Sequence, residues 1–112
     1  METFTDGQFD GTTLRRPGRW VVAFLADWCP FCQRFRGPLV AWRPPTGVRA
    51  AIADLTDLDS PLWDRFAIEV VPTVMGFRDG TGVGRRDGIA GRGLSPRALD
   101  ELASELNGSA HQ

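Results

Sequence analysis

The only two cysteines of this chain, Cys29 and Cys32, come shortly after an unbroken apolar run at residues 20–25. A run of that length without alternation predicts a strand covered on both faces, as in a parallel or mixed sheet flanked by helices. Apolar residues at helical spacing from Pro30 onward predict that a helix follows at once. The cysteines therefore lie at a strand-to-helix junction, where one helical turn brings two sulfurs within disulfide reach.

The two cysteines have different expected surroundings. Cys29 falls at the N-terminus of the predicted helix, where unpaired N–H groups and the helix dipole stabilise a thiolate. Cys32 falls on the stripe predicted to be buried, together with Phe35, Leu39 and Val40. Gly37-Pro38 is expected to kink or end this helix. Such a pair can exchange disulfides.

Composition narrows the class of protein. The chain has 112 residues, 42% of them apolar and 24% charged, which predicts a single domain over residues 1–112. Its net charge of −1 predicts binding neither to nucleic acid nor to a membrane, and the arginine pairs 15–16 and 85–86 are either docking patches or solvated surface. Without an export signal we expect a cytoplasmic protein, in which a lone cysteine pair is redox-active.

The first half of the chain contains two further predicted elements. Residues 5–8 have the T-x-x-Q form of a capping box between Phe4 and Phe9, which predicts a short helix to about Leu14. Residues 48–55 read as a strand, followed by a short helix that begins near Ser60 and Pro61.

The second half begins with an apolar run at residues 70–77, and Asp79-Gly80 predicts a hairpin turn after it. Residues 82–93 are expected to form the second hairpin strand with a loose end. A terminal amphipathic helix starts near Ser95-Pro96 and ends at Gly108, with a frayed tail beyond, and its predicted buried residues are Leu99, Leu102, Ala103 and Leu106. The predicted order is α-β-α-β-α-β-β-α.

That order, the W-C-x-x-C sequence at the junction, and a Val-Pro-Thr sequence at residues 71–73 together resemble the thioredoxin family over nearly the whole chain. The resemblance implies an α/β thioredoxin fold, with a central mixed β-sheet flanked by helices. It also implies a thiol-disulfide oxidoreductase that reduces protein disulfides and needs no bound cofactor or metal.

The resemblance assigns roles to individual residues. Cys29 becomes the exposed attacking nucleophile, Cys32 the buried resolving thiol and Pro72 a cis-proline beside the disulfide. The main chain of Val71 then pairs with the substrate, and either Gly91 or Gly93 lines the substrate groove. The alternative for Pro72 is an ordinary turn proline.

The motif itself supplies the remaining substrate-binding candidates, Trp28, Pro30 and Phe31. Trp28 either helps to form the docking surface or is a core aromatic. Phe31 either contacts substrate near the surface or folds back onto Trp63 or Pro72.

The sequence departs from the family pattern in two respects. Pro-Phe replaces the usual Gly-Pro between the cysteines, which leaves the direction of disulfide exchange open. Ala23 stands where the family buries an aspartate as proton acceptor, and Ala50 is assigned to the position of its lysine partner. Asp27 is the nearest acid in sequence, but it reads as a solvated carboxylate. No buried base is therefore predicted for Cys32.

We expect a monomer whose partners are protein disulfide substrates and a reductase or low-molecular-weight thiol as electron donor. Three other functions remain open: a disulfide oxidase or isomerase, a glutaredoxin-like enzyme, and a non-catalytic binding module on the same scaffold. Zinc would need ligands from two subunits, because the only histidine, His111, lies in the predicted frayed tail.

Overall fold

A mixed five-stranded sheet organises the computed structural model, which describes residues 1–108. The strand order is β1–β5–β4–β6–β7, with β1, β5 and β4 parallel and β6 and β7 antiparallel to their neighbours. The bounds are β1 (Glu2–Phe4), β4 (Arg19–Leu25), β5 (Val48–Asp54), β6 (Thr73–Arg78) and β7 (Thr81–Asp87). The central mixed sheet predicted from the sequence is thus confirmed.

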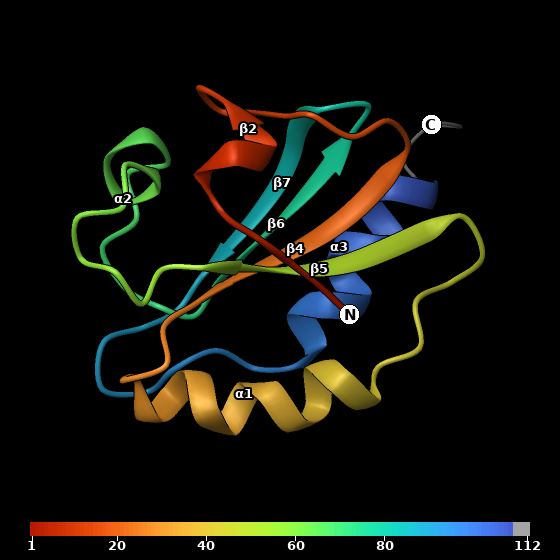
Figure 1. Ribbon diagram of the computed structural model, residues 1–112. Helices are drawn as coiled ribbons and strands as arrows, with labels where there is room; N and C mark the ends of the chain where they lie inside the picture. Colours follow the sequence, from red (N-terminus) through yellow and green to blue (C-terminus); the bar gives the residue numbers. More distant parts are fainter. Residues whose placement is uncertain (109–112) are drawn as a thin grey trace.

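Helices flank this sheet. The helix that follows β4 is α1 (Pro30–Ala41), the short α2 (Leu62–Arg65) follows β5, and α3 (Arg97–Gly108) ends the described chain. Figure 1 shows α1 below the sheet, with α2 and the segment that contains β2 (Phe9–Asp10) above it. The indole N–H of Trp42 donates to the Asp100 carboxylate at 2.9 Å and so connects the end of α1 to α3. None of the helices in residues 1–108 is long and apolar enough to cross a membrane.

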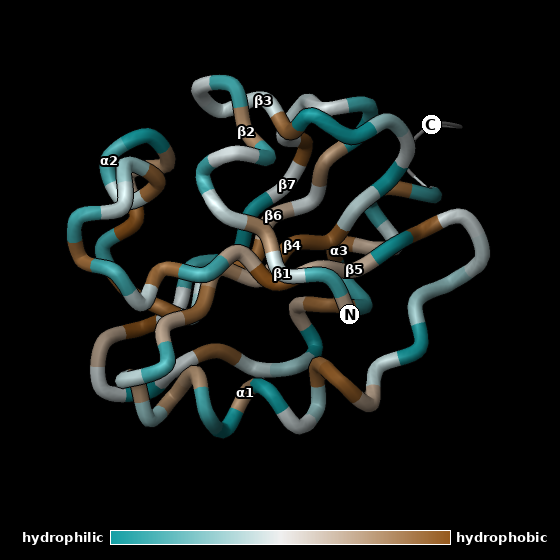
Figure 2. The backbone as a smooth tube through the Cα atoms, in the orientation of Figure 1, coloured by the Kyte–Doolittle hydropathy of each residue, from teal (hydrophilic) through white to brown (hydrophobic). Residues whose placement is uncertain are grey.

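The sheet separates two kinds of core. Phe9, Phe24, Phe66 and Phe77 pack ring against ring on one side, with centroids 5.0 to 6.2 Å apart. The other side carries the leucines of α3, and Leu106 lies 3.5 Å from where a Cβ on Gly76 would be. Figure 2 shows the hydrophobic residues gathered along the central strands. Because β4 is covered on both faces, it contains no alternating polar residues.

The predicted helix to Leu14 is wrong, although its starting signal is real. The capping box forms, with the Thr5 N–H donating to Gln8 Oε1 at 2.7 Å, but it supports only a single 3-10 turn, Asp6–Gln8. The chain then reverses at Gly11, which has φ +60°, and forms a hairpin of β2 (Phe9–Asp10) and β3 (Thr13–Leu14). A left-handed residue at this point ends any helix.

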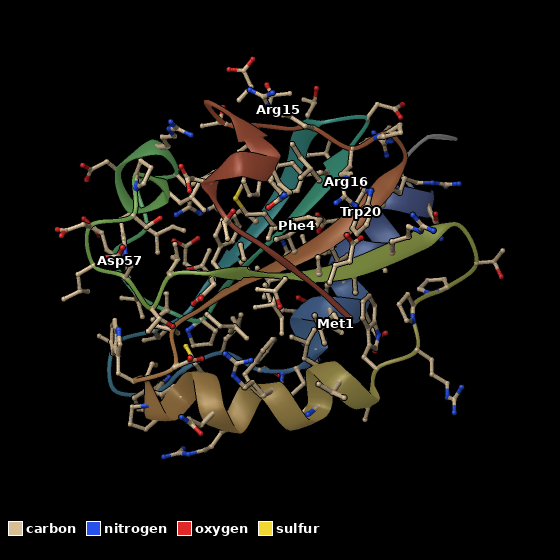
Figure 3. All side chains as sticks on the ribbon, viewed as in Figure 1. Met1, Phe4, Arg15, Arg16, Trp20 and Asp57 are labelled. Atoms are coloured by element: carbon tan, nitrogen blue, oxygen red, sulfur yellow. The ribbon has the colours of Figure 1, made fainter. Side chains whose placement is uncertain are left out.

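The N-terminal strand was not predicted and is held by side chains from the segment after the hairpin. Arg16 pairs with Glu2 at 2.8 Å, and its guanidinium lies 5.0 Å from the Phe4 ring centroid and 5.6 Å from that of Trp20. Figure 3 shows Phe4, Arg16 and Trp20 grouped beside the strand. Arg16 is therefore engaged within the protein, and this argues against a docking role for that arginine.

Of the two outcomes predicted for Gly37-Pro38, a kink or an end of the helix, the end is excluded, because α1 continues through both residues to Ala41. Both residues are exposed, and the helix continues although Pro38 has no N–H to donate to the carbonyl four residues earlier. Phe35 and Leu39 are buried as predicted, but Val40 is 68% exposed because it lies one residue, or about 100°, around the helix from Leu39.

The C-terminal half follows the predicted pattern more closely. Asp79 and Gly80 have φ +48° and +90°, which makes the tight hairpin turn that their sequence predicts. The Ser95 hydroxyl accepts from the Arg97 N–H at 3.2 Å, and all four predicted apolar positions of α3 are buried. Gly108 is the last helical residue described, not a cap beyond the helix. The predicted frayed tail and His111 lie outside the described residues.

Candidate active site

The two cysteines lie where β4 delivers the chain to the start of α1. Cys29 is the N-cap of the helix, and its sulfur accepts a hydrogen bond from the Cys32 N–H at 3.3 Å. Pro30 occupies the first helical turn, where its missing N–H leaves no partner unsatisfied. Both cysteines are free thiols in this structure. The helix cap therefore fixes the Cys29 sulfur at the start of α1.

The accessibility of the sulfurs corrects one expectation. Cys32 is fully buried, and Cys29 is only 5% exposed instead of open to solvent. The Cys29 thiol donates to the Val71 carbonyl at 3.5 Å, so the chain around Val71 covers the sulfur. Cys29 is still the outer member of the pair. An incoming disulfide has to displace this contact.

Cys32 is held as a thiol. Burial raises the pKa of Cys32 to about 12, and the neighbouring Cys29 adds to the rise. The Ala26 N–H opposes it by donating to the Cys32 sulfur at 3.5 Å. Any reaction that needs the Cys32 thiolate must therefore first remove a strongly held proton from this sulfur.

The Val71–Pro72 peptide bond is cis. Pro72 is buried, and its carbonyl accepts from the Gly88 N–H at 2.8 Å. A Cβ on Gly88 would lie 2.5 Å from that carbonyl oxygen, so only glycine fits beside the proline. Gly88 was not predicted as a site residue. Its only signal is its position at the start of the glycine-rich segment after β7.

Trp28 forms part of the surface and is not a core aromatic. It is 53% exposed and stacks on Trp63, with ring centroids 6.3 Å apart and 11° between the planes. Its indole N–H donates to the Thr56 carbonyl at 3.0 Å. A tryptophan held by stacking and a hydrogen bond, with one face open, can contact a bound chain.

Phe31 is half-buried and lies against Gly93. A Cβ on Gly93 would be 2.9 Å from the Phe31 ring, and Gly93 has φ +84°. The guanidinium of Arg34 lies 5.0 Å from the same ring centroid. Gly91 also has a positive φ, +78°, but no heavy atom would lie within 4 Å of its Cβ. Of the two glycines weighed for the groove, Gly93 is therefore the one that touches the motif.

No carboxylate replaces the missing buried base among residues 1–108. Ala23 pairs in register with Ile52, and Ala50 pairs with Val21, two residues earlier along the same strands. Neither Ala23 nor Ala50 has a side chain that can accept a proton, so these two positions supply no base. Asp27 is exposed and bonded to Arg36 at 2.7 Å. Within the same residues, no three His, Cys, Asp or Glu side chains gather to hold a metal ion.

Comparisons with known proteins agree with this geometry. The thioredoxin family model matches residues 1–95. Protein disulfide-isomerase A3 of Gallus gallus is 31% identical over 108 residues, which cover 95% of this chain and 20% of that protein. Thioredoxin-related transmembrane protein 1 of Bos taurus is 33% identical over 66 residues, which cover 56% of this chain and 23% of that protein. The chain thus spans about a fifth of the length of these curated relatives.

Among solved structures, thioredoxin f2 of Chlamydomonas reinhardtii superposes with a TM-score of 0.76 at 23% identity, covering 96% of both chains. The fold is therefore the thioredoxin fold, as the sequence predicted. At this identity the superposition supports the architecture alone, and the chemistry depends on the family match and on the cysteine pair.

Proposed function

The chain belongs to the thioredoxin family, and from that premise we propose that it reduces disulfide bonds of other proteins through Cys29 and Cys32. One observation carries the proposal. The Cys29 sulfur caps α1 and contacts the Val71 carbonyl next to a cis-proline, while Cys32 lies one turn further into the helix. An outer sulfur that is held for attack and an inner sulfur within reach of it support a two-step exchange.

Each step of the exchange forms one sulfur–sulfur bond and breaks another. The Cys29 thiolate attacks one sulfur of the substrate disulfide, forms a mixed disulfide and releases the other substrate sulfur as a thiolate. The Cys32 thiolate then attacks the Cys29 sulfur and releases the second substrate sulfur. Two electrons pass to the substrate, which leaves with two thiols, and the enzyme keeps a Cys29–Cys32 disulfide.

The second step needs the Cys32 proton to leave, and the site has no buried carboxylate to take it. The substrate thiolate that departs in the first step is the base closest at hand, because it is released beside the mixed disulfide. The Ala26 N–H, which donates to the Cys32 sulfur, then stabilises the thiolate as it forms. On this account the substrate's own leaving group replaces the family's aspartate.

The proposal extends to partners and compartment. Protein disulfides are the substrates, a reductase or low-molecular-weight thiol restores the dithiol, and the reducing direction implies a cytoplasmic setting. Val71 supplies the backbone contact for the bound chain. Trp28, Pro30 and Phe31 line the surface on which that chain lies.

A second candidate function uses the same cysteine exchange to form disulfides in other proteins or to rearrange them. Pro-Phe between the cysteines and the 31% identity to a protein disulfide-isomerase favour a disulfide oxidase or isomerase. The reduction potential separates the two functions, because reductants of the thioredoxin type lie near −270 mV and isomerases and oxidases near −180 to −120 mV.

The first experiment equilibrates the protein in glutathione buffers and counts free thiols by mass. A potential near −270 mV supports the reductase, and one above about −200 mV supports the second candidate. Cys32→Ser should trap the mixed disulfide with a substrate protein, and Cys29→Ser should abolish turnover and trapping alike. Catalysis that survives Cys29→Ser would contradict both candidates. Binding of a partner that survives without any catalysis in the wild type would instead support a binding module.

A further inference from the structure

A pocket of about 170 Å³ opens beside Phe31, between α1 and the segment that precedes α3. Phe31, Phe35 and Leu94 form its apolar part. Two arginines also line it, Arg34 from α1 and Arg92 from the segment that precedes α3. We call this the arginine pocket. Among the described residues, no carboxylate lines it. Its position next to the residue between the two cysteines places it within reach of a bound substrate chain.

The two arginines of the pocket differ from several others in the molecule. Arg16, Arg36 and Arg86 each pair with a carboxylate of the chain. Within residues 1–108, neither Arg34 nor Arg92 has such a partner, and Arg34 instead lies over the Phe31 ring. Two guanidinium groups without a carboxylate at one apolar pocket leave a local excess of positive charge.

The loop that carries Arg92 is fixed at both ends. Gly88 donates to the Pro72 carbonyl at 2.8 Å, and Ile89 and Gly93 exchange two backbone hydrogen bonds of 2.9 and 2.8 Å. Gly93 in turn lies against Phe31. The backbone of Arg92 is therefore held relative to both the cis-proline and the cysteine motif.

Building on the proposed function, we propose that the arginine pocket binds a carboxylate side chain of the substrate. The residue bound is an aspartate or glutamate close in sequence to the disulfide cysteine. Guanidinium forks match carboxylates in geometry and charge, and the apolar part of the pocket accommodates the methylene stem. The protein then prefers disulfides in acidic segments over neutral or basic ones.

Three disulfide peptides test the preference. They share one sequence and carry Glu, Gln or Lys at the positions within three residues of the cysteine. For the wild type, kcat/KM should be about fivefold higher for the Glu than for the Gln peptide, as two partly exposed ion pairs would give. Arg34→Gln with Arg92→Gln should bring that ratio to about one, while turnover of the Gln peptide is retained. Added salt should reduce the wild-type ratio.

The matched control is Arg15→Gln with Arg43→Gln. It removes the same two charges from exposed arginines outside the pocket and should keep the fivefold ratio. Figure 3 shows Arg15 at the far side of the molecule from the start of α1. If the control loses as much preference as the pocket variant, the effect comes from net charge and the proposal is wrong. A wild-type ratio of one overturns it directly.

A binding measurement separates this inference from the proposed function. Glu and Gln peptides with serine in place of cysteine are titrated into the labelled protein and followed by amide NMR. Either peptide can shift the signals of Phe31 and Gly93, which lie at the proposed binding surface, but only the Glu peptide should shift those of Arg34 and Arg92. Shifts of the two arginines without catalysis of any disulfide peptide support the pocket and contradict the reductase. Catalysis without these arginine shifts supports the reductase and contradicts the pocket.

Discussion

The two sides of the cysteine pair are built differently. On one side, which we call the tryptophan flank, Trp28 stacks on Trp63, and the two indole N–H groups donate to the carbonyls of Thr56 and Asp57. On the other side, the arginine pocket holds two guanidinium groups with no carboxylate partner among residues 1–108. On the tryptophan flank both indole N–H groups already have partners within the protein. In the arginine pocket the two guanidinium groups remain available to pair with a charged ligand.

The charges around the two sides also differ. Asp57 and Asp59 are exposed in the loop that leads to Trp63, and Figure 3 shows Asp57 at the outer edge of the molecule on the α2 side. A chain with an acidic residue is repelled there and attracted to the arginine pocket. On the pocket proposal, the tryptophan flank supplies a fixed apolar contact, whereas the arginine pocket discriminates between substrates and sets the direction in which they lie.

The largest expected effect is the pH dependence of stability that Cys32 causes. This thiol is buried between the two sides, and neither side supplies a base that could take its proton. Because its folded-state pKa is raised to about 12, the folded protein keeps a proton that the unfolded chain releases above its ordinary thiol pKa of about 8.5. The stabilisation is complete below about pH 8.5 and is lost as pH rises toward 12, by at most about 1.4 kcal/mol per pH unit. Urea unfolding of the reduced protein at pH 7, 9 and 10 measures it.

Cys32→Ser is the control for this pH dependence, because it keeps Cys29 and lacks the buried thiol. The wild type should lose about 2 kcal/mol more than this variant between pH 7 and 10. Equal slopes for the two proteins would mean that one side of the site does stabilise the Cys32 thiolate, and the contrast between the two sides would be wrong on this point.

The cysteine site could be predicted from sequence because its signals are local. Each of its signals spans only a few residues: a strand-length apolar run, two cysteines one turn apart and a later Val-Pro-Thr. Strands β4, β5 and β6 and the Asp79-Gly80 turn have local signals of the same kind. The helix predicted to Leu14 failed because the capping box fixes only one turn. The path of the chain beyond that turn is decided by Gly11 and by packing of Phe9 onto distant phenylalanines.

The two sides of the site could not be predicted, because they are formed by contacts between residues that are distant in sequence. Gly88 against Pro72 and Gly93 against Phe31 join residues that lie far apart in sequence, and nothing local separates these glycines from Gly91. The register that sets Ile52 beside Ala23 is a property of the sheet, not of either strand alone.

An effect of comparable size is expected from Gly93, which holds Phe31 at the edge of the arginine pocket. Gly93→Ala and Gly91→Ala both place a Cβ at positive φ, which costs about 1 kcal/mol at either position. Only the Gly93 variant also meets the Phe31 ring, which should add about 1–3 kcal/mol and displace Phe31. Thermal unfolding of the two variants should therefore differ, and the Glu-to-Gln peptide ratio should fall in the first variant alone. Equal unfolding midpoints would show that Phe31 moves away from the new Cβ without any loss of stability.

The smallest effect belongs to the tryptophan flank. Trp28→Phe keeps an aromatic ring over Trp63 but removes the N–H that donates to the Thr56 carbonyl, which lies near solvent and can bond water instead. The expected loss is about 0.5 kcal/mol in the free energy of unfolding, measured in urea. If this side contributes contact without charge discrimination, kcat/KM should fall by a similar factor for the Glu, Gln and Lys peptides, and their ratios should stay as in the wild type. A change in those ratios as large as that produced by replacing Arg34 and Arg92 would show that the two sides do not divide the work in this way.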